Sequence, residues 1–158
     1  MKRVNILLFL HLLILQIGWG QTDSLAIPFL NDAQQSLIRE TPQITAFQVD
    51  DFKAVEGTTN LLEEFKILNQ VSLDASQSSY LKETFLNQSN YLLTHKIKQC
   101  FFLPQMGFQL TSDAGTMNVL ISLECRMIRF YQNGAFDLYY FNDNMSSLSD
   151  FYDGLFKR

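Results

Sequence analysis

The segment from Lys96 to Asn142 constrains the fold most, because apolar runs alternate there with short turn signals. Asn133-Gly134 is the strongest of these signals, since both central residues of a type I′ hairpin turn need a positive φ angle. Ser112–Gly115 suits a second hairpin with a three-residue loop that ends in glycine. The strands expected around these turns are Lys98–Leu103, Met106–Thr111, Thr116–Glu124, Arg126–Gln132 and Ala135–Phe141. Tight hairpins join antiparallel strands, so this segment predicts an antiparallel β-meander.

Three other segments have the apolar spacing of helices that face a core. We expect helices at Leu25–Glu40, from Asp74 onward and from Ser147 onward. Asp74 and Gln77, three residues later, are typical of a capping box at a helix start. The sequence therefore predicts an α+β fold, in which the antiparallel meander is packed on one face by two or three helices.

Two strands are also expected before the meander. Ile44–Val49 is rich in β-branched and aromatic residues, and Asp50-Asp51 is expected to end it. In Leu61–Leu73, Leu61, Leu62 and Phe65 fit a short helix, whereas Phe65–Leu73 fits a strand nearly as well, and we favour the strand from Phe65 onward.

The first twenty residues have the pattern of a signal peptide. Lys2 and Arg3 precede the apolar run Ile6–Ile17, and Gly18 and Gly20 supply the small residues of a cleavage site. An uncleaved anchor is the alternative, but it needs ~20 apolar residues. We therefore predict a signal peptide at residues 1–20, and a single α+β domain at residues 21–158 that is secreted or periplasmic. No later segment is long and apolar enough to span a bilayer.

The charge of the chain argues against nucleic acid as a partner. Twelve basic and sixteen acidic residues give a net charge of −4, and removal of Lys2 and Arg3 would lower it to −6. A chain with no basic excess cannot neutralise a phosphate backbone. The same charge disfavours anionic lipid surfaces.

No motif in the sequence identifies a catalytic, cofactor-binding or metal-binding residue. Ser79 and Lys82 match Ser-x-x-Lys, but the accompanying motifs of the penicillin-binding enzymes are absent. After cleavage His95 would be the only histidine, whereas metal sites usually need three or four ligands. The acidic pairs Asp50-Asp51 and Glu63-Glu64 are interpreted as turn and surface charge.

Cys100 and Cys125 are expected to form a disulfide, because exported proteins keep disulfides and only one internal pairing exists. A simple hairpin at Ser112–Gly115 would set the two cysteines three residues out of register. A bulge or strand break near Pro104 and Gly107 would remove this offset. Two buried free thiols and a redox pair are the alternatives, and a thiol or metal site with His95 or Met106 is a further one.

The aromatic strand Ala135–Phe141 offers a candidate contact face. Strand alternation sends Phe136 and Tyr140 to one side of the sheet, and Tyr139 and Phe141 to the other. Either the last helix covers Tyr139 and Phe141, which we favour, or these two residues contact a ligand or a protein.

The block around the cysteines resembles a pattern found in small secreted bacterial proteins. It comprises Cys100-Phe101-Phe102-Leu103-Pro104, the turn Asp113-Ala114-Gly115, and Cys125 at the end of the returning strand. Some of those sequences carry a histidine before the glycine that follows the proline, where this chain has Met106. That family has no established activity, so the resemblance implies an exported domain and no particular reaction.

These observations favour an exported, non-enzymatic domain that binds a protein or a cell-envelope component, without a cofactor. The alternative is a small extracytoplasmic hydrolase whose site is assembled from residues far apart in the sequence. A pocket with converging polar groups would favour the hydrolase, whereas an exposed aromatic surface would favour binding.

Overall fold

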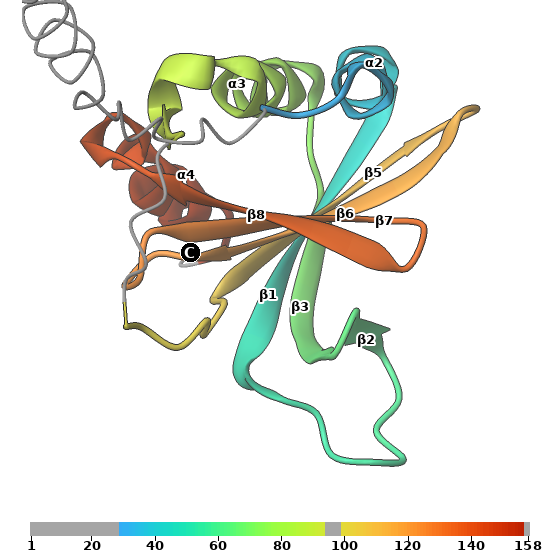
Figure 1. Ribbon diagram of the computed structural model, residues 1–158. Coiled ribbons are helices and arrows are strands. Elements are labelled where there is room, and N and C mark those ends of the chain that lie inside the picture. Colours follow the sequence, from blue (N-terminus) through green and yellow to red (C-terminus); the bar gives the residue numbers. More distant parts are fainter. Residues whose placement is uncertain (1–28, 94–98, 157–158) are drawn as a thin grey trace, which may run out of the picture.

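The computed structural model describes residues 29–93 and 99–156 (Figure 1). The predicted signal peptide, His95 and Lys98 therefore lie outside the described residues. The described residues form an eight-stranded antiparallel sheet in the order β2-β3-β1-β5-β6-β7-β8-β4, together with three α-helices. The predicted α+β class and the antiparallel meander are thus confirmed. In Figure 1, α2 and α3 lie above the twisted sheet and α4 lies to one side.

The meander follows the predicted hairpins closely. Its strands are β5 (Met106–Ser112), β6 (Gly115–Ser122), β7 (Met127–Gln132) and β8 (Ala135–Phe141). Asn133 and Gly134 both have positive φ angles, 55° and 78°, as the type I′ turn requires. The other turn is tighter than predicted, because Ser112 pairs directly with Gly115 and leaves a two-residue loop.

The helices begin where side-chain caps satisfy the free N–H groups of the first turn. α3 (Ala75–Leu86) is capped by Asp74 and Gln77, which form the predicted capping box. α4 spans Ser147–Phe156, as expected. The first described helix, α2 (Asp32–Glu40), begins later than the predicted Leu25, because Asn31 forms a capping box with Gln34.

The strand β1 (Gln43–Lys53) runs past Asp50-Asp51, where the sequence predicted its end. Its pairing with β3 (Phe65–Ser72) is irregular beyond Val49, and this end projects below the rest of the sheet with β2 (Leu61–Leu62) (Figure 1). Carboxylates remain hydrated in such a projection, so they do not end the strand. The strand from Phe65 is confirmed, whereas the short β4 (Tyr91–Leu92) was not predicted.

The predicted strand Lys98–Leu103 is wrong, because its described residues 99–103 are irregular. Pro104 has no N–H to donate to a strand partner, and regular pairing begins only at β5. Before it, the Gln105 N–H donates to the Ile121 carbonyl at 3.1 Å. This irregular segment carries Cys100 and is called the disulfide loop (residues 99–105).

Two clusters of buried side chains stabilise the fold. The larger takes residues from all three helices and from the sheet, with Phe85, Phe108 and Phe130 in contact at its centre. The smaller contains Phe47, Val49, Leu62, Phe65, Leu120 and Tyr131, all from strands. Gly107 lies over this smaller cluster, where a Cβ atom would contact two buried leucines. The sheet is therefore packed on both of its sides.

Candidate functional site

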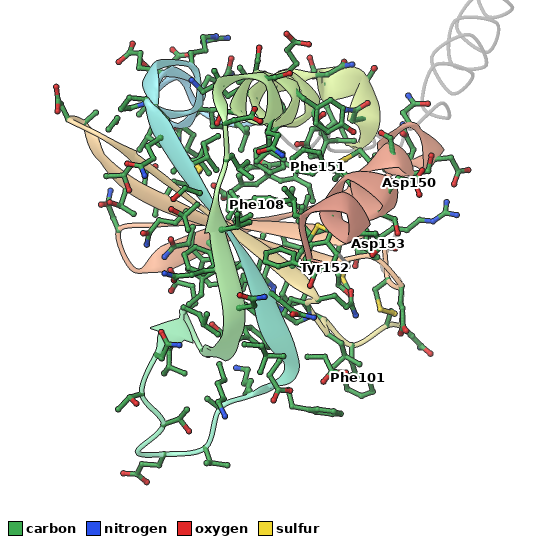
Figure 2. All side chains as sticks on the ribbon, turned by 180° about the vertical axis from the view of Figure 1, so that it is seen from behind. Phe101, Phe108, Asp150, Phe151, Tyr152 and Asp153 are labelled. Atoms are coloured by element: carbon green, nitrogen blue, oxygen red, sulfur yellow. A yellow bond between two sulfur atoms is a disulfide. The ribbon has the colours of Figure 1, made fainter. Side chains whose placement is uncertain are left out.

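Exposed apolar side chains gather near one end of the molecule. Six large hydrophobic residues in the described part of the chain are exposed: Phe52, Val55, Leu61, Leu68, Phe101 and Phe136. The first four lie on or beside the projecting end of β1, β2 and β3, and Phe101 lies in the disulfide loop. Phe52 and Phe101 are 67% and 86% exposed. Figure 2 shows Phe101 at the periphery of the molecule, away from the core residue Phe108.

Phe52 and Phe101 line the same groove, which has a volume of about 470 Å³. Four elements contribute to it: β1, β3, the disulfide loop and β7. Its lining residues are Phe52, Lys53, Phe65, Phe101, Phe102, Leu103 and Arg129. The volume lies within the range typical of ligand pockets, ~300–1,000 Å³. We refer to this feature as the aromatic groove.

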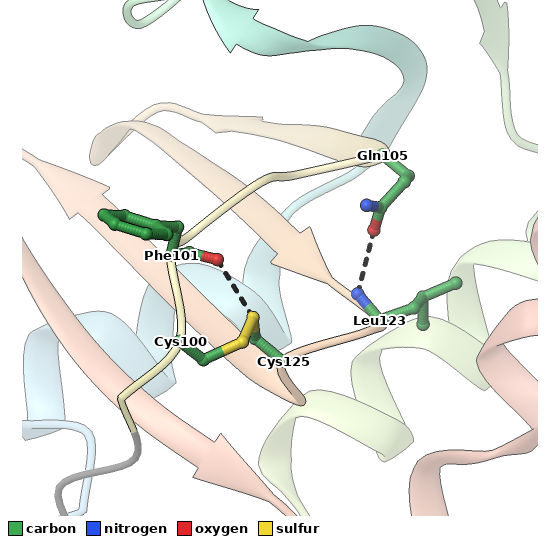
Figure 3. The surroundings of a disulfide bond; sticks show 5 residues. All are labelled: Cys100, Phe101, Gln105, Leu123 and Cys125. Carbon is green, nitrogen blue, oxygen red and sulfur yellow. Dashed lines mark hydrogen bonds between the residues drawn. A yellow bond between two sulfur atoms is a disulfide. The ribbon is translucent and has the colours of Figure 1, made fainter.

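The disulfide holds one wall of the aromatic groove in place (Figure 3). Cys100 and Cys125 are bonded, as predicted, and their Cα atoms are 5.9 Å apart. The Phe101 carbonyl oxygen lies 2.9 Å from Cys125 Sγ, a close contact that involves no proton because the sulfur is in a disulfide. At the far end of the loop, Gln105 Oε1 accepts a hydrogen bond from the Leu123 N–H at 2.9 Å. The loop that carries Phe101 and Phe102 is thus anchored at both ends to the chain that follows β6.

Arg129 lies between two aromatic rings at the base of the groove. Its guanidinium carbon is 3.9 Å from the Phe102 ring centroid and 4.5 Å from that of Phe136. Both distances are within the range of a cation–π interaction, below ~6 Å. The Arg129 side chain is only 19% exposed, and its Nε atom has no hydrogen-bond partner among the described residues. The rings therefore hold a partly desolvated cation in a fixed orientation.

Two polar side chains contact this guanidinium, and Lys53 lies beside one of them. Arg129 Nη1 donates to the Tyr131 hydroxyl at 3.2 Å and lies 3.6 Å from Glu64 Oε1. The Tyr131 hydroxyl donates to the same Glu64 oxygen at 3.4 Å, and Lys53 Nζ lies 3.6 Å from it. Burial raises the pKa of Tyr131, so its phenol remains a donor at neutral pH.

The arrangement is suited to binding an anion beside an apolar group. Lys53 and Arg129 supply two positive charges, and Glu64 supplies one negative charge near them. One positive charge is left in excess on a surface that is otherwise aromatic. A partly buried arginine with fixed orientation is the usual protein partner of a carboxylate.

The candidate contact residues Tyr139 and Phe141 lie elsewhere in the molecule. They are 3% and 4% exposed and belong to the larger core cluster, together with Leu148 and Tyr152 of α4. Both residues are therefore buried in the core, and the exposed phenylalanines Phe52 and Phe101 line the aromatic groove.

The Ser79 and Lys82 side chains are not paired with each other. Ser79 Oγ donates to Glu83 Oε1 at 3.4 Å, whereas Lys82 Nζ donates to the carbonyl oxygens of Thr41 and Arg39 at 2.5 and 3.2 Å. A lysine in this position satisfies the free carbonyls at the end of α2. Lys82 thus has a structural role in joining α2 to α3.

Among residues 29–93 and 99–156, no group of three His, Cys, Asp or Glu side chains is placed to hold a metal ion together. Within the same ranges, no helix has the length and apolar character needed to cross a membrane.

Arg129 and its aromatic neighbours were not predicted from the sequence. Arg129 is the one charged residue within β7, and it alternates with the buried Ile128 and Phe130. That pattern places Arg129 on the opposite side of the strand from the main core, which is also where an ordinary surface arginine would lie. Its contact with Glu64, which precedes β3, joins parts of the sheet that are not neighbouring strands and therefore carries no local signal.

Comparisons with known proteins give no relative for this chain. No family model matches it, and no curated protein or solved structure is similar to it. The resemblance to small secreted bacterial proteins therefore stays a prediction, and the function has to be argued from the aromatic groove.

Proposed function

We propose that this chain is a non-enzymatic binding domain that holds a protein partner, or a protein component of the cell envelope, in the aromatic groove. The observation that carries the proposal is the exposure of Phe52 and Phe101 beside a partly buried arginine. Exposed apolar clusters of this kind mark interaction sites, because covering them removes apolar surface from water. Aromatic residues and arginine are also the residues that dominate binding energies at protein interfaces.

We also infer that the helices pack on the side of the sheet opposite the groove. Buried residues of all three helices belong to the larger cluster, and the smaller cluster takes none of them. Phe130 lies in the larger cluster, whereas its neighbours Arg129 and Tyr131 lie at the groove and in the smaller cluster. Neighbouring strand residues point to opposite sides, which supports this division.

Export is also part of the proposal. The signal-peptide pattern at residues 1–20 supports it, and so does the disulfide, which persists in oxidising compartments. Cleavage after Gly20 would remove Trp19, the only tryptophan. Exported protein should then lack a tryptophan band on excitation near 295 nm, while excitation at shorter wavelength still gives tyrosine emission. An intact mass that includes residues 1–20 would contradict this part of the proposal.

The binding function is tested by peptide display against the folded protein. We expect selection to yield peptides that bind the wild type and bind the double variant Phe52→Ser/Phe101→Ser at least tenfold more weakly. Both substituted residues are exposed, so the variant should fold normally. Leu68→Ser is the matched control, since Leu68 is 54% exposed but does not line the groove. Peptides that bind both variants like the wild type would refute the proposal.

A further inference from the structure

The charge of the aromatic groove differs from the charge of the chain. The chain has a net charge of −4, whereas the groove is lined by Lys53 and Arg129 and by no carboxylate. Glu64 Oε1 lies 3.6 Å from the charged nitrogens of both residues, and its single charge balances only one of the two cations. We propose that the partner is a polypeptide segment that presents an acidic side chain between apolar ones, with its carboxylate bound by Arg129. This inference rests on the proposed function and specifies the ligand of the same groove.

Arg129 is prepared for a carboxylate before the partner arrives. The rings of Phe102 and Phe136 fix the plane of the guanidinium, so little rotamer freedom is lost on binding. Its contact with Glu64, at 3.6 Å, is longer than the ~2.7–2.9 Å of a charge-assisted hydrogen bond. Its Nε atom is buried and so is not open to a ligand. The terminal nitrogens, whose contact with Glu64 is long, therefore keep donor capacity that an incoming carboxylate can use.

A polypeptide fits the surface better than a small acid does. The apolar surface extends past the groove itself, since Val55 is 79% exposed on the loop after β1. A small aromatic acid would fill the groove and leave this surface uncovered. An anionic membrane is disfavoured because it would bring many negative charges against Glu56 and Glu63, which are exposed on the same projection, whereas the proposed segment brings one carboxylate, to Arg129.

The test compares two peptides that differ by one charge. The probes are acetyl-Phe-Glu-Phe-amide and acetyl-Phe-Gln-Phe-amide, titrated into the wild-type protein by calorimetry at low salt. We expect the glutamate peptide to bind at least tenfold more tightly, because only it can form a charged pair with Arg129. Equal affinities would overturn the inference, while the binding function would still stand on the display experiment.

Variants then assign the preference to one residue. Arg129→Gln should reduce the preference for the glutamate peptide to less than threefold. Arg126→Gln is the matched control, because Arg126 pairs with Asp143 outside the groove and should leave the preference intact. A preference that survives Arg129→Gln would overturn the assignment. If Arg129→Gln fails to fold, the ratio of the affinities of the two peptides for the wild-type protein alone decides whether the inference holds.

Two further probes distinguish the polypeptide segment from a small acid and from a membrane as the ligand of the groove. Phenylpropionate carries the same charge and one ring, and we expect it to bind more weakly than the glutamate peptide. Equal binding would replace the polypeptide with a small acid. Vesicles of anionic phospholipid should not sediment the protein, and sedimentation that depends on Phe101 would replace the polypeptide with a membrane.

Discussion

Removing the disulfide should destabilise the protein and disorder one wall of the aromatic groove. The bond joins Cys100 and Cys125, which are separated by 25 residues in sequence. In the loop-entropy account, closing a loop of this length lowers the entropy of the unfolded chain and stabilises the fold by about 3.5 kcal/mol. Domains of this size are stable by only ~5–15 kcal/mol, so this is a large share.

The perturbation is the double variant Cys100→Ala/Cys125→Ala, measured by urea unfolding. We expect its free energy of unfolding to fall by about 3.5 kcal/mol, with a larger dependence on urea because its unfolded state is less compact. The same wild-type protein treated with a reductant is the control, since it loses the bond and keeps the side chains. The two should agree within about 1 kcal/mol, because Cys100 is exposed and a free, buried Cys125 packs as a small apolar residue, as alanine does.

A loss below about 1 kcal/mol in both samples would refute this reasoning, because the loop-entropy term would then be absent. A loss confined to the alanine variant would assign the effect to the substitutions. Thiol titration of the denatured, unreduced wild type should find no reactive thiol, as the bonded pair requires.

Three further predictions concern packing, capping and pH. Gly107→Ala should cost ~1–3 kcal/mol in urea unfolding, because its Cβ would crowd the buried side chains of two leucines on β2 and β6. Gly154→Ala in α4, where nothing lies within 4 Å of the new Cβ, should instead stabilise by ~0.5–1 kcal/mol, and a loss there would contradict the packing argument. Asp74→Ala should cost ~1 kcal/mol through loss of the α3 cap, and an unchanged unfolding midpoint would contradict the capping argument. Burial raises the pKa values of Tyr139 and Tyr152 from 10.0 to about 12, so their contribution to stability is complete below pH 10 and is lost as the pH rises toward 12. Absorbance near 295 nm should show that these phenols ionise only as the protein unfolds at alkaline pH. Full ionisation near pH 10 in folded protein would contradict the raised pKa values.

Much of the fold could be predicted because its signals are local. The turn at Asn133-Gly134 and the cap at Asp74 each depend on a few neighbouring residues, and both predictions are confirmed. The disulfide could be predicted by elimination, since only two cysteines exist. The continuation of β1 past Asp50-Asp51 could not be predicted. It depends on the pairing of this end of β1 with β3, in a projection where the carboxylates stay in contact with water.

The candidate site could not be predicted because it joins four separate parts of the chain. Arg129 of β7 contacts Glu64, which precedes β3, although the two strands are not neighbours in the sheet and the two residues are 65 positions apart. Phe102 reaches Arg129 because the disulfide loop is irregular, where the sequence predicted a strand. The alternation around Tyr139 and Phe141 separated the two sides of β8 correctly, yet it did not indicate which side the larger core would occupy.

The central claim is that the aromatic groove around Arg129 is the binding site, and NMR shift mapping of the full chain tests it most directly. The probe is acetyl-Phe-Glu-Phe-amide, added to isotope-labelled protein with assigned backbone amides. We predict that the largest shift changes fall on Phe52, Lys53, Phe101, Phe102 and Arg129, all of which line or frame the groove. Changes centred on the helices α2 or α4, with the groove amides unmoved at saturation, would contradict the account.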